Sequence, residues 1–398
     1  MSLGRLPVER NEPRATFELM AGGAAAFARI LERIDTAERS VLVRCFEWRD
    51  DDTGQMVARA LLRAADRGVE IKILKDRVGM AYEHLEGTKQ SFFHKRIGLI
   101  PRLQTWSLMT VYGRWGSLRQ RPSPLADALL NHQMVTVNHH QKRFDHAKLY
   151  VFDDETVILG GMGIGDDFRH HNVDFMVEIS GGGAAARLAD RYDGRAAFDP
   201  ERAFDYLLHS FKGSAHPKKG QRVALAKQRL ALLASAQKRL TIEMAYFGDK
   251  ACTTALVDAV KRGVQVTVLT AARANIIGDL NLWTCAQLLR RTGSPENLRI
   301  VLHPRMVHGK AVVGDGAWVD IGSTNFTPPS HGGYEEVDLF CRDAAFAKQV
   351  EDAIEHDIGA GKPAKLPLRY RRPYVVLERM LGSFHGRKKK SKVKGRAR

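Results

Sequence analysis

The hydrophobic and polar positions of this chain follow the same pattern twice. Residues 60–74 (ALLRAADRGVEIKIL) and residues 255–269 (ALVDAVKRGVQVTVL) align without gaps. Each stretch begins with the spacing of an amphipathic helix, reaches Gly68 or Gly263, and continues as an alternating strand of apolar residues. An apolar strand precedes each helix, SVLVRCFEW in the first copy and RLTIEMAYF in the second. We therefore predict a duplicated β-α-β unit, with a period too long for a solenoid repeat.

The alternation of strands and helices also predicts the fold class. Strands that are connected through helices run parallel, so the pattern indicates an α/β architecture with mostly parallel central sheets. A chain of 398 residues can bury one large core or two fused ones. Together with the duplication, this length favours two similar lobes.

Two of the predicted core strands carry ionisable side chains. The strands are DHAKLYVFDD and MVHGKAVVGD, and each holds a His, a Lys and an Asp at the same spacing: His146, Lys148 and Asp153 in the first, His308, Lys310 and Asp315 in the second. The His and the Lys are two positions apart, so they share one face of a strand. One such pair could be a core histidine beside a lysine that extends to water. The exact recurrence favours a functional site instead.

The repeated spacing continues beyond these strands. Fourteen residues after each His comes a small-residue turn, Gly160-Gly161 in the first half and Gly322-Ser323 in the second. Twenty-eight residues after each His is a carboxylate, Asp174 or Glu336. We therefore expect the two halves to deliver equivalent side chains to one shared site.

The chemistry that suits two histidines and two lysines is displacement at phosphorus. One imidazole attacks as a nucleophile and the second protonates the departing oxygen. The lysines neutralise the charge on the phosphoryl oxygens, and the carboxylates orient the imidazoles. Lysine is a poor metal ligand, so the set argues against a metal site. We expect neither a metal nor a cofactor.

Both strands match the H-x-K-x4-D motif of the phospholipase D superfamily, and the chain resembles its bacterial cardiolipin synthases. The stretch GGMGIGDDF (residues 160–168) resembles a Gly-Gly-Met-Asn-Ile-Gly-Asp-Glu-Tyr segment of that branch, and GSTNFTPPS (residues 322–330) resembles its Gly-Ser-x-Asn segment. The resemblance covers about residues 16–360. It implies two α/β-sandwich lobes related by a pseudo-twofold axis.

On this basis we divide the chain into four parts. These are an N-terminal extension (1–15), a first phospholipase D-like domain (16–205), a second one (206–362) and a basic C-terminal tail (363–398). Compared with the second domain, the first carries 33 extra residues before its motif. We place this insertion at 80–140, near the mouth of the site.

The resemblance also implies a role for each candidate residue. His146 and His308 would be nucleophile and acid, with His146 favoured as the nucleophile, and Lys148 and Lys310 would bind phosphate. Asp153 and Asp315 close the motif, where we expect a structural part. The supporting set comprises the phosphate-side pair Ser323 and Asn325 and the histidine-supporting acids Asp174 and Glu336.

Three positions depart from the family pattern. Gly163 stands where the family has Asn, Pro328-Pro329 replace an Arg, and Tyr334 replaces an Asn. These changes leave the phosphate chemistry intact, but they leave the lipid and the acceptor alcohol open.

The implied activity is a phosphatidyl transfer of the cardiolipin-synthase type through a covalent phosphohistidine. Hydrolysis of the phospholipid by water is one alternative. A phosphodiesterase acting on nucleic acid is another, because the superfamily includes nucleases and the net charge of +17 suits an anionic polymer. The internal duplication and the GGMGIGDDF stretch favour lipid. A degenerate binding scaffold is disfavoured because all six motif residues are present.

Several features predict a membrane partner. The insertion interleaves aromatic and apolar residues with Arg and Lys: Phe92, Phe93, Trp106, Leu108, Met109, Val111, Tyr112 and Trp115. The tail combines one apolar stripe, formed by Leu377, Met380, Leu381 and Phe384, with eight basic residues in 387–398. The alternatives are an extra helical layer for the insertion and a helix docked on the protein itself for the tail.

The remaining sequence features bear on location. No run of 18 apolar residues predicts a membrane span, and the N-terminal residues do not resemble a secretory signal. The four cysteines have no paired spacing, which favours a reducing compartment. We expect a cytoplasmic protein bound peripherally to the inner face of the cell membrane, with phospholipid and an anionic membrane surface as partners. The oligomeric state stays open.

Overall fold

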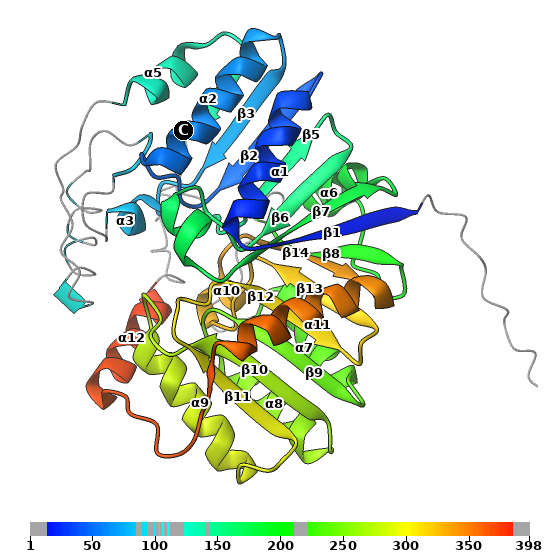
Figure 1. Ribbon diagram of the computed structural model, residues 1–398, viewed down its shortest axis with the longest axis vertical. Helices are drawn as coiled ribbons and strands as arrows, with labels where there is room; N and C mark the ends of the chain where they lie inside the picture. The colour runs from blue at the N-terminus through cyan, green and yellow to red at the C-terminus, as the bar shows by residue number, and fades with distance from the viewer. Residues whose placement is uncertain are drawn as a thin grey trace, which may run out of the picture.

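The computed structural model describes residues 14–84, 90–93, 99, 103, 106, 110–111, 123–139, 144–210 and 222–384. These residues form two α/β lobes, each built around one sheet and covered by helices (Figure 1). The predicted two-lobed architecture is confirmed.

The first lobe contains a seven-stranded sheet. Its strand order is β1 (Ala15–Ala21), β7 (Phe175–Gly181), β6 (Thr156–Gly160), β5 (Leu149–Phe152), β2 (Ser40–Cys45), β3 (Glu70–Lys75) and β4 (Val135–Asn138). Its helical elements are α1 (Gly23–Thr36), α2 (Asp52–Asp66), α3 (Met80–Glu83), α5 (Pro124–Asn131), α6 (Ala184–Asp193) and a π-helical turn η1 (Asp167–His171).

The second lobe contains an eight-stranded sheet with an equivalent order. Its strands are β8 (Phe204–His209), β14 (Glu336–Cys341), β13 (Trp318–Gly322), β12 (Lys310–Gly314), β9 (Arg239–Met244), β10 (Gln265–Ala271), β11 (Leu298–His303) and the added edge strand β15 (Lys362–Pro363). Its helices are α7 (Ala224–Ser235), α8 (Lys250–Lys261), α9 (Gly278–Thr292), α10 (Pro328–Gly332), α11 (Ala344–Gly359) and α12 (Arg372–Phe384).

The sheets are mixed, which corrects the expectation that they would be mostly parallel. In the first lobe two pairs are parallel: β2–β3, which belongs to the predicted β-α-β unit, and β3–β4, whose outer strand lies in the region predicted as an insertion. The other four pairings of that sheet are antiparallel. The motif strand β5 turns directly back into β6 through Asp153 and Asp154, whose φ angles are 53° and 58°. A left-handed turn of this kind produces a hairpin, and hairpins pair antiparallel strands.

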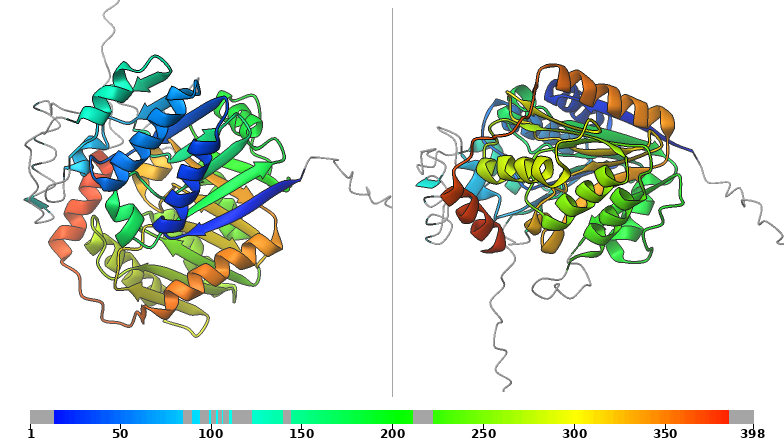
Figure 2. Two further views of the ribbon diagram at one scale, coloured as in Figure 1. Left: turned by 45° about the horizontal axis from the view of Figure 1, so that its top comes forward. Right: turned by 90° about the horizontal axis from the view of Figure 1, so that it is seen from below.

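The two sheets pack against each other through one apolar core. Leu149 and Val177 of the first lobe belong to the same buried cluster as Ala311 and Leu339 of the second. Both motif strands contribute to this core, and in Figure 2 the orange helix α11 of the second lobe lies beside the blue strand β1 of the first. The motif residues therefore start from a rigid, two-sided interface.

Two regions that we singled out for membrane contact are described in part. In the insertion, Phe92 and Phe93 are buried against Trp48, whereas Leu103 and Trp106 are 57% and 54% exposed. Val111 is half-buried, and Leu108, Met109, Tyr112 and Trp115 lie outside the described residues.

The C-terminal apolar stripe falls on α12, which packs against α9 (Figure 1). Leu377 is half-buried and Met380 is exposed; the side chains of Leu381 and Phe384 and the basic run 387–398 lie outside the described part. The described helices do not include one with the length and apolar content needed to cross a membrane.

Candidate active site

The two motif histidines stand at the seam, each bound through its backbone to the other lobe. His146 comes just before β5, and its backbone N–H donates to the carbonyl oxygen of Glu335 at 2.8 Å. His308 comes just before β12, and its backbone N–H donates to the carbonyl oxygen of Val173 at 2.6 Å. Glu335 and Val173 each precede one of the predicted carboxylates. The duplication therefore places equivalent backbone groups around one site.

Each imidazole is paired with a carboxylate of the opposite lobe. Nδ1 of His146 lies 3.0 Å from Oε2 of Glu336, and Nδ1 of His308 lies 2.7 Å from Oδ2 of Asp174. A proton on Nδ1 that is donated to the carboxylate leaves the lone pair of Nε2 for chemistry. Both histidines line one cavity of about 950 Å³. This cavity is large enough for a phosphate headgroup and a second reactant.

Burial keeps both histidines neutral near pH 7. Burial lowers the pKa of His146 to about 4, against the opposing effect of Glu336. Burial and the adjacent Lys310 lower the pKa of His308 to about 3. A neutral imidazole is the form that attacks phosphorus, whereas the acid partner must gain a proton as the anionic substrate binds.

The two motif lysines lie beneath the histidines. Their side chains are almost fully buried, and neither is among the residues that line the cavity. The ammonium group of Lys148 donates to the carbonyl oxygen of His146 at 2.5 Å, and that of Lys310 donates to the carbonyl oxygen of His308. The Lys310 ammonium also lies 3.0 Å from Nδ1 and 3.3 Å from Nε2 of His308, so its charge is directly beside the imidazole ring. Burial lowers the pKa of both lysines, that of Lys310 to about 7.

Ser323 and Asn325 support the site from the second lobe alone. The hydroxyl of Ser323 donates to Oε2 of Glu336 at 2.6 Å and accepts the N–H of Val337 at 3.0 Å. Asn325 lines the cavity, and its buried Oδ1 has no hydrogen-bond partner among the described residues. In the first lobe the position of Ser323 is Gly161, where a Cβ would lie only 2.2 Å from Oδ1 of Asp174.

The motif aspartates Asp153 and Asp315 lie away from the cavity, in the hairpin turns. The Asp153 carboxylate accepts three backbone N–H groups, from Glu38, Arg39 and Ser40, at 2.7–3.1 Å. The Asp315 carboxylate accepts the equivalent three, from residues 237–239, at 2.7–3.2 Å. Each side chain therefore ties the motif hairpin to the strand beside it, which is a positioning task.

Two kinds of residue at the site were not found from the sequence. Aromatic rings flank the imidazoles: the ring centroid of Phe46 is 5.0 Å from that of His146, and the centroid of Phe168 is 5.3 Å from that of His308. Below His146, the buried guanidinium of Arg44 pairs with Asp145 and Glu335. The sequence signal that could have revealed this ionic cluster is Arg44 itself, a charged residue in an otherwise apolar strand.

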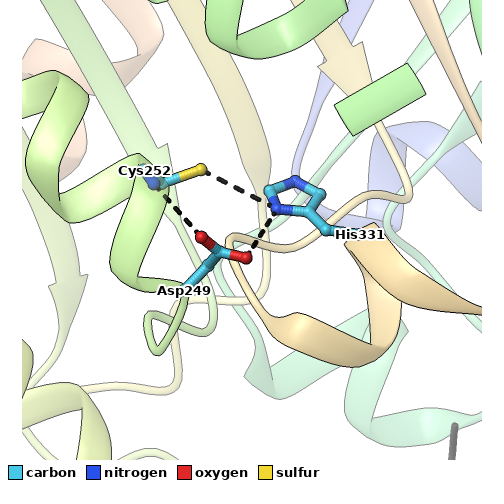
Figure 3. A group of neighbouring side chains, drawn as sticks. All are labelled: Asp249, Cys252 and His331. Atoms are coloured by element: carbon cyan, nitrogen blue, oxygen red, sulfur yellow. Dashed lines mark hydrogen bonds and ion pairs between the residues drawn. The ribbon is translucent and has the colours of Figure 1, made fainter. Parts of the chain in front are cut away.

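Within the described residues, Asp249, Cys252 and His331 form one cluster of potential metal ligands (Figure 3), and Asp249 also lines the cavity. Nδ1 of His331 lies 3.2 Å from Oδ2 of Asp249 and 3.8 Å from Sγ of Cys252. Arg222 binds both carboxylate oxygens of Asp249 at 2.7 and 2.8 Å and approaches Nδ1 of His331 at 3.4 Å. Burial also raises the pKa of the Cys252 thiol well above its usual range. The cation held by this cluster is thus a guanidinium, and we assign no metal to it.

Comparison with known proteins agrees with this architecture. The profile of one family, described as "Cardiolipin synthase, PLD-like domain", matches residues 30–195 and 230–358. The chain is 28% identical to cardiolipin synthase A of Pseudomonas entomophila over 375 residues, which cover 89% of this chain and 70% of the relative. It is 22% identical to cardiolipin synthase B of Salmonella typhi, with coverages of 85% and 79%.

A solved structure extends the likeness to the fold. The crystal structure of phosphatidylserine synthase from Haemophilus influenzae Rd KW20 superimposes with a TM-score of 0.66 at 17% identity. The match covers 94% of this chain and 95% of that one. Both lobes and their mutual arrangement are therefore shared with a protein of remote sequence.

Proposed function

Because the chain belongs to the cardiolipin synthase family with its phospholipase D-like domains, we propose that it is a phosphatidyltransferase that works through a covalent phosphohistidine. The observation that carries the proposal is the pair of imidazoles at one cavity, each oriented by a carboxylate of the opposite lobe. This arrangement supplies a nucleophile and an acid at once, which is what displacement at a phosphodiester requires.

In the first step Nε2 of His146 attacks the phosphorus of the donor phospholipid. The bond from phosphorus to the headgroup oxygen breaks, and His308 protonates that oxygen, so an alcohol leaves and a phosphatidyl group stays on His146. In the second step His308 takes the proton of the acceptor hydroxyl, whose oxygen attacks phosphorus and displaces His146. Lys148 and Lys310 neutralise the charge of the phosphoryl oxygens in both steps.

Hydrolysis is the same reaction with water as the acceptor. The balance between transfer and hydrolysis depends on how well the cavity holds an alcohol near His308. The walls carry several aromatic and apolar side chains, including Phe46, Phe168 and Tyr246. Such walls favour a lipid over a nucleic acid strand, whose binding would be dominated by phosphate contacts.

The test is an incubation of the purified protein with three substrates: phosphatidylglycerol vesicles, phosphatidylethanolamine vesicles and single-stranded DNA. From phosphatidylglycerol we expect free glycerol and a transfer product with two phosphatidyl groups and four acyl chains, formed at an undiminished rate in the presence of a chelator. Shortened DNA with intact lipid would favour the nuclease alternative. Activity that disappears with chelator and returns with a divalent ion would contradict the metal-free mechanism.

We further place the protein peripherally on an anionic membrane, at the inner face of the cell membrane. Exposed apolar side chains of the insertion, Leu103 and Trp106, and of α12, Val376 and Met380, support this placement. The eight basic residues of 387–398 add attraction to anionic lipid. Deletion of residues 377–398 should weaken sedimentation with anionic vesicles, most clearly at low salt. If the truncated and full-length proteins sediment equally with the vesicles at every salt concentration, the C-terminal tail does not bind the membrane, and the insertion becomes the candidate membrane contact.

A further inference from the structure

Helix α12 lies outside the residues matched by the family profile, which end at 358, yet it forms part of the wall of the active-site cavity. It contributes Glu378 and Arg379 to that wall. The cavity wall that α12 forms is thus charged, and it lies beyond the part of the chain that the family profile matches.

Two contacts fix α12 against the start of α9. Arg371, just before α12, binds the Asp279 carboxylate through its backbone N–H at 2.7 Å and through its guanidinium at 2.8 and 3.0 Å. About two turns further along the chain, the buried carboxylate of Glu378 accepts the backbone N–H of Leu280 at 2.7 Å. Because both contacts use the first turn of α9, α12 has a defined position and orientation at the cavity.

That position places Arg379 over an aromatic ring. Its guanidinium carbon is 3.7 Å from the centroid of the Trp283 ring, and both side chains line the cavity. A guanidinium stacked on an aromatic face is held in a plane and keeps its N–H donors at the edges. Such a group is ready for bidentate binding of a phosphate.

The cations around the cavity fall into two groups. Arg49 and Arg222 are neutralised by carboxylates: Arg49 by Asp167 at 2.5 Å and Arg222 by Asp249 at 2.7 Å. Arg379, Arg291 and Lys250 also line the cavity, but within the described residues none of these three forms an ion pair with a carboxylate. They come from α12, α9 and α8, on the second-lobe side of the cavity.

We propose that Arg379, supported by Arg291 and Lys250, binds the acceptor phosphate when the acceptor is itself a phospholipid, and that it thereby sets the preference for such an acceptor over a free alcohol. This inference rests on the proposed transferase function. A joining reaction brings two substrates to one cavity, and the histidines and lysines take the donor phosphate. A second phosphate in the same cavity requires separate, unpaired donors, because charge-assisted contacts to phosphate are strongest where no protein carboxylate competes.

The experiment compares two soluble acceptors that differ in phosphate. With a short-chain phosphatidyl donor, transfer to glycerophosphoglycerol and to glycerol is measured for the parent protein and for Arg379→Gln. We expect the ratio of kcat/KM for glycerophosphoglycerol to that for glycerol to fall about tenfold in the variant, the usual effect of losing one charged hydrogen bond. The ratio for Arg379→Lys, which keeps the charge but not the planar guanidinium, should lie between those of the parent and of Arg379→Gln. An unchanged ratio in Arg379→Gln would overturn the proposal.

The matched control is Arg372→Gln, an exposed arginine at the start of the same helix that does not line the cavity. It should leave the acceptor ratio at the parent value, and thermal denaturation of all variants checks that they fold. If the parent protein joins neither acceptor, the transferase proposal is wrong. The subsite is then tested by calorimetric titration with glycerophosphoglycerol: weaker binding to Arg379→Gln than to Arg372→Gln supports it, and equal binding refutes it.

Discussion

The strands that lie beside the two motifs, β2 and β9, align residue by residue but carry opposite groups at one buried position. In β2 the position is Arg44, which pairs with Asp145 of its own lobe and with Glu335 across the seam. In β9 it is Glu243, which packs against Gly309, where a Cβ would lie 2.1 Å from its carboxylate oxygen. The neighbours that correspond to Asp145 and Glu335 are Val307 and Val173, both buried and apolar.

The two lobes thus repeat the backbone and the reactive residues while differing in the layer beneath. Below His146 lies an ionic cluster that connects both lobes. The equivalent place beside His308 holds the carboxyl group of Glu243, and burial raises its pKa well above the ordinary value of 4.5. Burial of this kind favours the protonated, neutral form of the carboxyl group. The comparison teaches that pseudo-symmetry of shape does not make the two halves electrostatically equal, so equivalent substitutions should have unequal effects.

The largest expected difference concerns the two histidines. His146→Ala and His308→Ala should each lower transfer from a phospholipid by at least about 10³-fold, within the range for a lost acid or base. With a p-nitrophenyl phosphodiester, whose leaving group needs no proton, His308→Ala should recover much of its rate and His146→Ala should not. The rates of both variants with both substrates, and the phosphohistidine trapped in each, decide which histidine is the nucleophile. Recovery of the rate in His146→Ala alone would mean that His308 is the nucleophile and His146 the acid.

A large effect on stability is expected for Arg44→Met. The change leaves Asp145 and Glu335 buried without their cation, which costs about 3–5 kcal/mol of unfolding free energy. Chemical denaturation measures it, and Arg299→Met is the control, because Arg299 and Glu355 form a pair with both side chains 50% exposed. The control should cost no more than about 1 kcal/mol. If both variants lose the same unfolding free energy, the ionic cluster below His146 contributes no more to stability than an exposed ion pair.

The counterpart change, Glu243→Gln, should make the protein increasingly more stable than the parent as the pH rises. Because the folded state raises the pKa of Glu243, the folded protein holds a proton that the unfolded chain releases above pH 4.5. The stability of the parent therefore falls as the pH rises through this window, by at most about 1.4 kcal/mol per pH unit for one group. The variant lacks this slope. When chemical denaturation is measured at pH 5, 6, 7 and 8, the stability of the variant relative to the parent should grow from pH 5 upward until Glu243 ionises in the folded state. A difference that does not change with pH would show that Glu243 is ionised in the fold.

The smallest effect is expected for Ser323→Ala, which makes the second lobe resemble the first at the Gly161 position. The change removes the hydroxyl that donates to Glu336. We expect kcat to fall about tenfold, since one hydrogen bond to a charged group is lost. If kcat is plotted against pH and one limb of the bell-shaped profile is displaced from its position in the parent, Ser323 acts through the Glu336–His146 pair. A fall in stability with unchanged kcat would assign it to folding only.

The sequence predicted the repeat and the set of site residues because both depend on local spacing. Helical and strand periods recur at matching positions, and His, Lys and a carboxylate follow in the same order. The strand directions beyond the β-α-β unit were wrong, because the turns at Asp153–Asp154 and Asp315–Gly316 were not recognised as hairpins. The roles of the individual site residues stay predictions.

Which carboxylate meets which histidine could not be predicted. Spacing alone is equally compatible with Asp174 supporting His146 and with the observed exchange. The contribution of α12 to the cavity wall could not be predicted either, because Glu378 and Arg379 approach the site only through the packing of α12 on α9. Contacts of this kind depend on three-dimensional docking and leave no periodic signal.

The exchange of carboxylates between lobes has a consequence for how such a chain can change. A single lobe contains a histidine but not its acid, so an unfused copy would be complete only as a self-complementary dimer about a twofold axis. In that dimer every substitution would occur twice, so an arginine at one position of the strand would be accompanied by an arginine at the same position of the partner strand. Fusion into one chain removes this constraint. Arg44 and Glu243 can then occupy equivalent places, and one histidine can specialise in attack while the other specialises in proton transfer.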